Sequence, residues 1–274
     1  MAAGSKSARA LLSGLIDYAG LFPPAGLEMA AAVRNYASYL AGEYSWMVGR
    51  FVVQAGRIDE FEKAASRYFG GHKWKIALLG RPARPVQVDA VELRAERIRD
   101  IEPFASADTY FEVTPALPLE STIEAIGKAG VRAKIRTGGL TPESFPKADR
   151  VARFLELCHK SGVAFKATAG LHHPVRGEHP FTYEPGSARG TMHGFLNLFL
   201  AAILIFSEGN EDDAAQLLGE ESADVFRFDD EAVCWRRYRL TLEQIRHTRE
   251  RFAISFGSCS FEEPVRELVA LGLL

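Results

Sequence analysis

The chain has 274 residues, of which 47% are hydrophobic and 25% charged, and its formal net charge is -2 at pH 7. These proportions are those of an ordinary globular protein with enough apolar side chains for a large core. Nucleic-acid binding usually needs a basic face, and peripheral membrane anchoring usually needs a polybasic segment. We therefore expect neither nucleic acid nor a membrane among the partners of this protein.

The cysteines and the N-terminal segment predict a cytoplasmic location. Cys158, Cys234 and Cys259 are widely spaced and include no CxxC pair, which fits neither a disulfide framework nor a zinc ribbon. Near the N-terminus, Lys6 and Arg9 precede a short apolar stretch that polar residues and a glycine interrupt. This stretch is too weak for the apolar region of a signal peptide.

Short β-rich apolar runs alternate with helical patterns along most of the chain. In chain order, the predicted strands span residues 15–19, 47–53, 74–79, 88–93, 109–113, 132–136, 164–168 and 252–256. Helical spacing is found between them at residues 27–40, 58–68, 121–128 and 148–159. This alternation predicts a parallel sheet, and eight strands predict its closure into one (β/α)8 TIM barrel that comprises residues 1–274. An open doubly wound sheet is the alternative, although no GxGxxG fingerprint follows the first strand.

About 80 residues separate the seventh and eighth predicted strands, far more than a normal connection in a β/α unit. In a barrel this insertion, 172–251, emerges at the C-terminal face, where active sites are built, so we expect a lid, an oligomer contact or both. Its apolar segment 195–206 is shorter than the roughly 20 residues that cross a bilayer. We expect this segment to be buried, in the core or under a partner subunit, and the protein to be a homo-oligomer.

Two predicted strands carry lysines where buried parallel strands are normally apolar. Alternation places Arg132, Lys134 and Arg136 on one face of the sixth strand, and Lys166 and Thr168 on one face of the seventh. If these faces point into the barrel, strands less than ~5 Å apart bring the two ammonium groups together. Like charges and partial desolvation lower the pKa of a lysine, whose amine then attacks a carbonyl to form a Schiff base. The alternative is that both lysines point outward and are solvated.

Carboxylates interrupt three other predicted strands. Asp17 lies in the first, Asp89 in the fourth and Glu112 in the fifth. A carboxylate on a barrel strand can move the protons that a carbonyl-attacking lysine must exchange. For any one of these acids, a salt bridge to Arg132 or Arg136 is the structural alternative.

The eighth predicted strand ends in FGSCSF, residues 256–261. Its backbone N–H groups and hydroxyls are suited to bind an anion, and a phosphate site after strands seven and eight is frequent in barrels. Small residues also make ordinary turns, so this segment alone is a weak indication.

The strand ends, taken in order, resemble the deoxyribose-phosphate aldolase family of class I, Schiff-base aldolases. KIRTGG from Lys134 resembles that family's KTSTG strand, which carries the Schiff-base lysine, and FKATAGLH around Lys166 resembles its FKxxGGxR strand, which carries the second lysine. VDAV around Asp89 is similar to its VDxV strand with the catalytic aspartate. FGSCS from residue 256 resembles its FGxSS phosphate loop, and LIDYAGLFPP from residue 15 resembles its opening LIDHTLLKP.

The resemblance implies a carbon–carbon lyase that performs reversible aldol cleavage or addition through an enamine, with no metal or other cofactor. Lys134 would be the nucleophile, Lys166 the cation that lowers its pKa, and Asp89 with Asp17 the proton relay. The substrate would be a small aldehyde, ketone or sugar, phosphorylated or not. The residues expected to bind it are Arg136, Thr168, Gly170, His172, Gly257, Ser258, Ser260 and Glu112.

The sequence also departs from the family pattern. His172 stands at the family's arginine, Ala169 at the first of its paired glycines, and Cys259 at the first serine of its phosphate loop. Arg136 is an additional cation. These departures indicate an altered anion site, and the long insertion points to a different substrate.

A metal site and a binding protein are the functional alternatives. Four histidines fall between residues 172 and 193, next to Glu178 and Glu184: His172, His173, His179 and His193. Histidines with a carboxylate bind zinc or iron, which would make the protein a metal-dependent barrel hydrolase or lyase, with Glu112 as a further ligand. No HxH or HExxH spacing is present. A catalytically degenerate barrel could instead serve in binding or assembly, although such a scaffold has no reason to retain buried charge.

Overall fold

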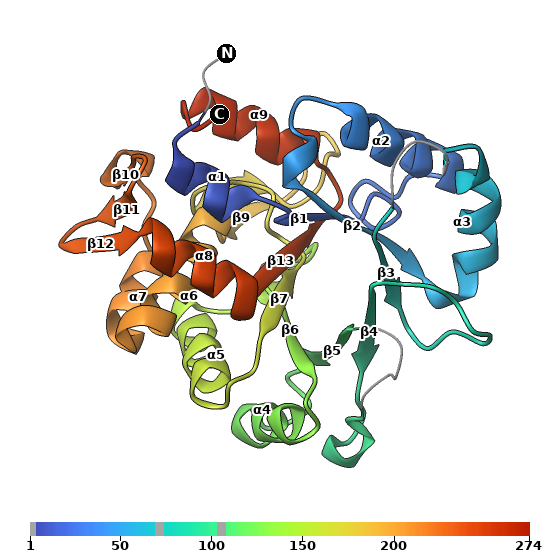
Figure 1. Cartoon of the computed structure of the whole chain (residues 1–274), viewed down its shortest axis with the longest axis horizontal. Helices are drawn as coiled ribbons and strands as arrows, with labels where there is room; N and C mark the ends of the chain where they lie inside the picture. The colour runs from blue at the N-terminus through green and yellow to red at the C-terminus, as the bar shows by residue number, and fades with distance from the viewer. Residues whose placement is uncertain (1–3, 69–73, 103–107) are drawn as a thin grey trace.

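The computed structural model describes residues 4–68, 74–102 and 108–274, which form a closed barrel of eight parallel strands (Figure 1). The strands pair in the order β1-β13-β7-β6-β5-β4-β3-β2 and return to β1, so the sheet has no free edge. The predicted (β/α)8 barrel is confirmed, and the open doubly wound sheet is excluded. The barrel strands are β1 (Ile16–Tyr18), β2 (Val48–Gln54), β3 (Ile76–Leu79), β4 (Ala90–Arg94), β5 (Asp108–Val113), β6 (Arg132–Arg136), β7 (Phe165–Thr168) and β13 (Ala253–Ser258).

Helices surround the barrel and cover the outer faces of its strands (Figure 1). In the helices that lie directly on the barrel, such as α2 and α4, apolar side chains recur at three- and four-residue steps, so one face is turned to the strands. Residues 80–89 connect β3 and β4 without a helix. The α-helices are α1 (Lys6–Leu12), α2 (Met29–Ala41), α3 (Ile58–Ala65), α4 (Leu119–Lys128), α5 (Ala148–Lys160), α6 (Phe195–Glu208), α7 (Glu211–Leu218), α8 (Leu242–Arg251) and α9 (Glu262–Ala270).

The inside of the barrel is unusually polar. The main hydrophobic core lies between the strands and the helices, whereas a separate small cluster of Val52, Ala77, Ala90 and Tyr110 lies inside the barrel. Much of the remaining interior holds charged side chains of the strands. Burying charge is costly unless each group is paired, so these residues must be arranged as partners.

The insertion between β7 and β13 begins at the C-terminal end of the barrel. Its hairpin, β8 (Gly177–Pro180) and β9 (Arg189–Met192), brings Phe181 and Met192 to the wall of the cavity described below. Beyond the hairpin come α6 and α7, followed by a three-stranded antiparallel sheet and α8. The strands of that sheet are β10 (Phe226–Phe228), β11 (Ala232–Trp235) and β12 (Tyr238–Thr241). The predicted oligomer contact stays a prediction.

The apolar segment of the insertion forms α6, which is part of the core. Its residues 195–205 are all buried. Phe195 and Phe199 lie against Phe256 of β13, with ring centroids 5.1 and 6.0 Å apart. A fully buried Phe, Leu or Ile side chain contributes roughly 1.5–3 kcal/mol, so α6 fastens the insertion firmly to the barrel. Within the three described ranges, no helix combines the length and the apolar character that crossing a membrane requires.

Candidate active site

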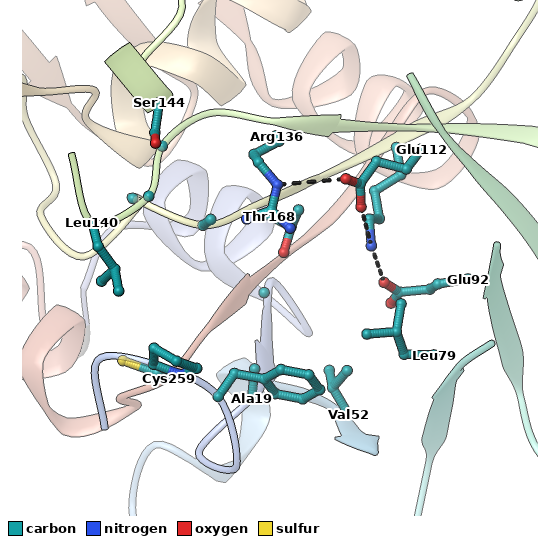
Figure 2. A pocket seen from close by; sticks show the side chains of 18 of the residues that line it. Ala19, Val52, Leu79, Glu92, Glu112, Arg136, Leu140, Ser144, Thr168 and Cys259 are labelled. Atoms are coloured by element: carbon teal, nitrogen blue, oxygen red, sulfur yellow. Dashed lines mark hydrogen bonds and ion pairs between the residues drawn. The ribbon is translucent and has the colours of Figure 1, made fainter. Parts of the chain in front are cut away.

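A cavity of about 780 Å³ lies at the C-terminal ends of the barrel strands (Figure 2). All eight barrel strands, or the loops that follow them, contribute to its lining, and the insertion adds Phe181 and Met192. This volume is within the range of pockets that bind small molecules. Because TIM-barrel enzymes have their active sites at this end, the cavity is the candidate active site.

Lys134 and Lys166 lie opposite each other on β6 and β7 and line the deep part of the cavity, with side chains only 3% and 1% exposed. The Lys166 Nζ is 2.6 Å from Asp17 Oδ2 and 2.5 Å from Glu92 Oε1. The Lys134 Nζ is 2.9 Å from both Glu92 Oε2 and Glu112 Oε2. Glu92 therefore offers one carboxylate oxygen to each lysine.

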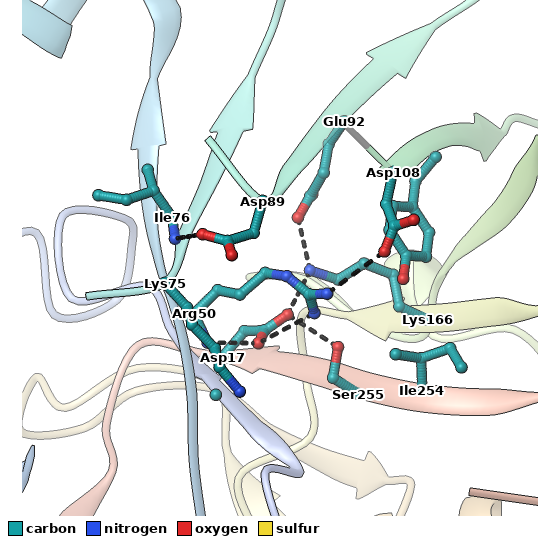
Figure 3. A network of polar contacts seen from close by, with 12 residues as sticks. Asp17, Arg50, Lys75, Ile76, Asp89, Glu92, Asp108, Lys166, Ile254 and Ser255 are labelled. Atoms are coloured by element: carbon teal, nitrogen blue, oxygen red, sulfur yellow. Dashed lines mark hydrogen bonds and ion pairs between the residues drawn. The ribbon is translucent and has the colours of Figure 1, made fainter. Parts of the chain in front are cut away.

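The ion pairs continue from the two lysines in both directions along the barrel axis, towards the mouth of the cavity and towards the opposite end of the barrel. Towards the mouth of the cavity, Glu112 Oε1 is 3.4 Å from Arg136 Nε (Figure 2). The same oxygen is 2.6 Å from an Arg94 nitrogen. Below the lysines, Asp17 Oδ1 accepts the backbone N–H of Arg50 at 2.7 Å and lies 4.0 Å from its guanidinium (Figure 3). We call this series the charge chain: Arg50, Asp17, Lys166, Glu92, Lys134, Glu112, and then Arg94 with Arg136. Its charges alternate in sign, which offsets the cost of burying them.

The charge chain fixes the ionisation of its members. Burial raises the pKa of Glu112, but Lys134, Arg94 and Arg136 together outweigh burial, and the pKa falls to about 2. Glu92 is completely buried, yet Lys166 and Lys134 also lower its pKa. Burial lowers the pKa of Lys166, but Asp17 and Glu92 outweigh burial and raise it well above its usual value. A neighbouring ammonium group on its own would lower the pKa of Lys166. The two carboxylates outweigh this effect, so Lys166 stays protonated.

Asp89, predicted as a proton relay, does not reach either lysine. It precedes β4 at the N-terminal end of the barrel, where its Oδ2 accepts the backbone N–H of Ile76 at 2.8 Å (Figure 3). Asp17, the second predicted relay group, does contact Lys166, but it is fully buried beneath that lysine and does not line the cavity. The predicted pair of relay carboxylates is therefore divided between two levels of the barrel.

Glu92 is the carboxylate that sequence reasoning missed. Residues three positions apart in a strand point to opposite faces, so Asp89 and Glu92 cannot both face the barrel axis. The register of β4 against β5 places Glu92 opposite Tyr110, a member of the interior cluster, and Glu92 therefore points inward. The indication was present in the sequence, because Glu92 alternates with Ala90, a small residue that suits the inside of a barrel.

Gln54 and Arg94 also line the cavity without having been singled out. The Gln54 Oε1 is buried, and it has no hydrogen-bond partner among the described residues. A buried polar atom without a partner costs about 1–3 kcal/mol, and a hydroxyl or amine of a substrate would remove that cost. Gln54 is thus a candidate to bind such a group.

Most of the residues predicted to bind substrate are found at the cavity. Those that line it are Glu112, Arg136, Thr168, Gly170, His172 and Gly257. Ser258 and Ser260 do not, because their hydroxyls shape the turn that leads into α9. Ser258 Oγ accepts the backbone N–H of Ser260 at 3.4 Å, and Ser260 Oγ accepts that of Glu263 at 3.1 Å. Cys259, between the two serines, lines the cavity instead.

The loops after β6 and β7 meet backbone to backbone at the cavity wall. A Cβ atom on Gly138 would lie 2.7 Å from the Gly170 Cα, and one on Gly170 would lie 2.8 Å from the Gly138 Cα. Gly170 also has a φ of +71°, which a residue with a Cβ rarely adopts. Thr137 Oγ1 joins the same loops by donating to the Ala169 carbonyl at 2.8 Å. Glycines at both positions thus hold the loops in the close contact that fixes this wall.

The four histidines considered as metal ligands are divided between two places. His172, His173 and His179 gather beside the cavity together with two glutamates of α9. His193 lies apart, where its Nε2 donates to a backbone carbonyl before α5 at 2.7 Å. Glu178 accepts a hydrogen bond from a threonine of β9 at 2.6 Å. The predicted ligand set is therefore only partly brought together, and its carboxylates come from α9.

The sequence matches no protein-family model, and no match is found among curated proteins or solved structures. The cavity, the charge chain and the histidine–glutamate group are the features from which a function can be inferred.

Proposed function

We propose that this protein is a carbon–carbon lyase of the Schiff-base aldolase type, with Lys134 as the nucleophile that attacks a small carbonyl substrate. The observation that carries the proposal is the position of the Lys134 Nζ, which lies at the deep end of the cavity with a carboxylate oxygen 2.9 Å away on two sides. Because Lys134 lines the cavity, its amine can reach the carbonyl of a bound substrate, and the two adjacent carboxylates can exchange the protons that imine formation requires.

The surroundings of the two lysines favour unequal roles. Asp17 and Glu92 hold Lys166 as an ammonium and raise its pKa, so it is a poor nucleophile. The carboxylates on either side of Lys134 include Glu112, which is the one nearer the mouth. We assign Lys134 to bond formation and Lys166 to keeping Glu92 ionised and in place.

The reaction can be balanced with these groups alone. The Lys134 amine adds to the carbonyl carbon, the carbonyl oxygen leaves as water, and a protonated imine results. In the cleavage direction a carboxylate removes the proton of the substrate's β-hydroxyl, the neighbouring C–C bond breaks, and its electron pair enters the imine to give an enamine. Glu112 and Glu92 are the carboxylates in position to accept and return that proton, a task the sequence had given to Asp89.

The mouth of the cavity favours an anionic substrate. The Arg94 and Arg136 side chains are 62% and 47% exposed, and both reach Glu112 Oε1 from above. Guanidinium groups bind carboxylates and phosphates through paired hydrogen bonds. We therefore propose that the substrate is a carbonyl compound or sugar with one carboxylate or phosphate group. This group would lie at the mouth of the cavity, next to Arg94 and Arg136.

Borohydride trapping with a panel of short aldehydes and ketones, with and without an anionic group, tests this function. The expected product is a reduced adduct on the peptide that contains Lys134. The Lys134→Arg variant keeps the positive charge but should give no adduct, whereas Lys166→Arg should still be labelled on Lys134. Lys128, an exposed lysine on α4, reports non-specific labelling in the same digest. Absence of any adduct above the Lys128 level would overturn the proposal, and an adduct on Lys166 would reverse the assigned roles.

A further inference from the structure

Three histidines and two glutamates form a compact group beside the cavity. His172 and His173 follow β7, and His179 lies in β8 of the insertion. Glu263 and Glu267 are one turn apart on α9, close to the C-terminus of the chain. The group thus joins three segments that are distant in sequence, and we call it the His–Glu cluster.

The contacts within the His–Glu cluster are short and direct. His172 Nδ1 is 3.0 Å from Glu263 Oε2, and His173 Nδ1 is 2.8 Å from Glu267 Oε1. The rings of His173 and His179 are stacked with centroids 3.3 Å apart. One possible ligand atom each from His173, Glu263 and Glu267 lie within 4.8 Å of one another. These atoms are close enough to converge on a single ion after small side-chain rotations.

The partners of the two glutamates in the His–Glu cluster are histidines and a tyrosine. Within the described residues, neither Glu263 nor Glu267 makes an ion pair with a lysine or arginine. The remaining side-chain partner of Glu263 is the Tyr183 hydroxyl at 3.0 Å, which is neutral. Two partly buried carboxylates that have no lysine or arginine partner among the described residues, held next to imidazole nitrogens, form a donor set suited to a divalent cation.

We propose that the His–Glu cluster binds one divalent transition-metal ion, of which Zn²⁺ is the best-suited example. The ligands are His173 Nδ1 and the carboxylates of Glu263 and Glu267, a set of nitrogen and oxygen donors that zinc accepts and that magnesium and calcium disfavour. His172 supports the site by holding the Glu263 carboxylate in place.

The ion would stabilise one wall of the large cavity and would not contact Lys134 or Lys166. A small cavity of about 50 Å³ lies beside the cluster and shares Pro24, His172, Phe181 and Met192 with the large one. A metal bound here ties the segment after β7 to α9 and so fixes the wall that His172 and the insertion provide. This site is independent of the amine chemistry proposed above and can be tested without any substrate.

Calorimetric titration of protein stripped with a chelator measures the site directly. We expect one Zn²⁺ per chain and an affinity for Mg²⁺ at least 100-fold weaker. Glu267→Gln and His173→Asn should each weaken Zn²⁺ binding by at least 100-fold, and His172→Gln by about 10- to 100-fold. Glu262→Gln, which changes an exposed residue of the same helix, and His247→Asn on α8 are matched controls that should bind like the unaltered protein.

Two further measurements keep the result unambiguous. Thermal unfolding of each metal-free variant should match that of the metal-free parent, which separates loss of ligands from loss of fold. X-ray absorption at the zinc edge should show nitrogen and oxygen neighbours without sulfur. Sulfur scattering would identify Cys259, which lies 3.7 Å from the Tyr183 hydroxyl, as a ligand and would overturn the site as proposed. Absence of stoichiometric binding, or unaltered binding by His173→Asn, would overturn it as well.

Discussion

Lys134 and Lys166 are register partners on neighbouring strands, but a carboxylate separates their ammonium groups, so they do not meet as a bare pair of like charges. Glu92 supplies that carboxylate from β4, on the other side of β5. The positions of both lysines therefore depend on Glu92. Removing its charge would leave two buried ammonium groups that share one neutral amide.

The Glu92→Gln variant should be strongly destabilised. Taking away one partner of a buried ion pair typically costs 3–5 kcal/mol, and Glu92 serves two pairs, so we expect a loss of about that size in the free energy of unfolding. Urea denaturation monitored by circular dichroism measures it. Glu60→Gln is the control, because Glu60 pairs with Arg57 on the surface and its loss should leave the midpoint unchanged. Equal midpoints for the two variants would contradict the importance of Glu92.

Because the pKa of Glu112 is lowered by folding, the free energy of unfolding should decrease as the pH falls into the acid range. Its pKa falls from an ordinary 4.5 to about 2 on folding, mainly because of Lys134, with burial opposing the shift. A carboxyl group whose pKa is lowered stabilises the fold above its unfolded pKa, and this stabilisation of about 3 kcal/mol disappears as the pH falls from about 4.5 towards 2. The difference in unfolding free energy between the parent and Glu112→Gln should therefore be largest at pH 7 and shrink towards pH 3.

Urea denaturation of both proteins at a series of pH values tests this dependence. The exposed Glu124, which pairs with Lys128 on α4, provides the control through Glu124→Gln. That variant should differ little from the parent at any of these pH values. A difference for Glu112→Gln that is constant between pH 7 and pH 3 would show that the carboxylate does not have the lowered pKa.

The fold and part of the site could be predicted because they follow from local patterns. All eight barrel strands were predicted within two residues at their N-terminal ends, since each is a short apolar run bounded by polar or small residues. Alternation could place Lys134 with Arg136 on one face of the sixth strand and Lys166 with Thr168 on one face of the seventh, because it fixes which residues of a strand share a face. That these faces point into the barrel is a finding of the structure. The twelve-residue apolar segment could be recognised as α6 and as buried from its composition alone.

The remaining features of the site could not be predicted, because they depend on contacts between segments that are distant in sequence. The alternation of Glu92 with Ala90 indicates that Glu92 faces the axis, but it is the register of β4 against its neighbours that decides between Glu92 and Asp89. The partners of His172 and His173 are 91 and 94 residues away in sequence, so Glu263 and Glu267 could not be found by spacing. The pKa of Lys166 likewise depends on carboxylates from two other strands.

The backbone contact between the loops after β6 and β7 can be tested at Gly170. In Gly170→Ala the new methyl group meets the Gly138 Cα at 2.8 Å and the residue keeps a φ of +71°. We expect destabilisation of about 2–5 kcal/mol, the sum of the left-handed conformation and the overpacking. Gly186→Ala is a matched control, because Gly186 has a φ of +79° but nothing within 4 Å of a Cβ. It should lose only about 1–2 kcal/mol. Equal losses would show that the loops can separate.

The guanidinium groups at the cavity mouth should set the preference for an anionic substrate. Arg136→Gln removes one donor to the anion but leaves Arg94 to hold Glu112, so the fold should be retained. A charge-assisted hydrogen bond contributes about 1.5–3 kcal/mol, which predicts a loss of roughly 10- to 100-fold in the trapping efficiency of a phosphorylated carbonyl compound.

The matched comparison is the same carbonyl compound without its phosphate, for which Arg136→Gln should trap as efficiently as the parent. Arg97→Gln controls for a general loss of positive charge, since Arg97 is exposed and pairs with Asp100, three residues away. Rising salt should weaken the preference of the parent for the phosphorylated compound more than that of Arg136→Gln, because the variant retains only Arg94 as a charge that salt can screen. If Arg136→Gln slows both compounds equally, the residue supports the site through Glu112 and does not contact the anion.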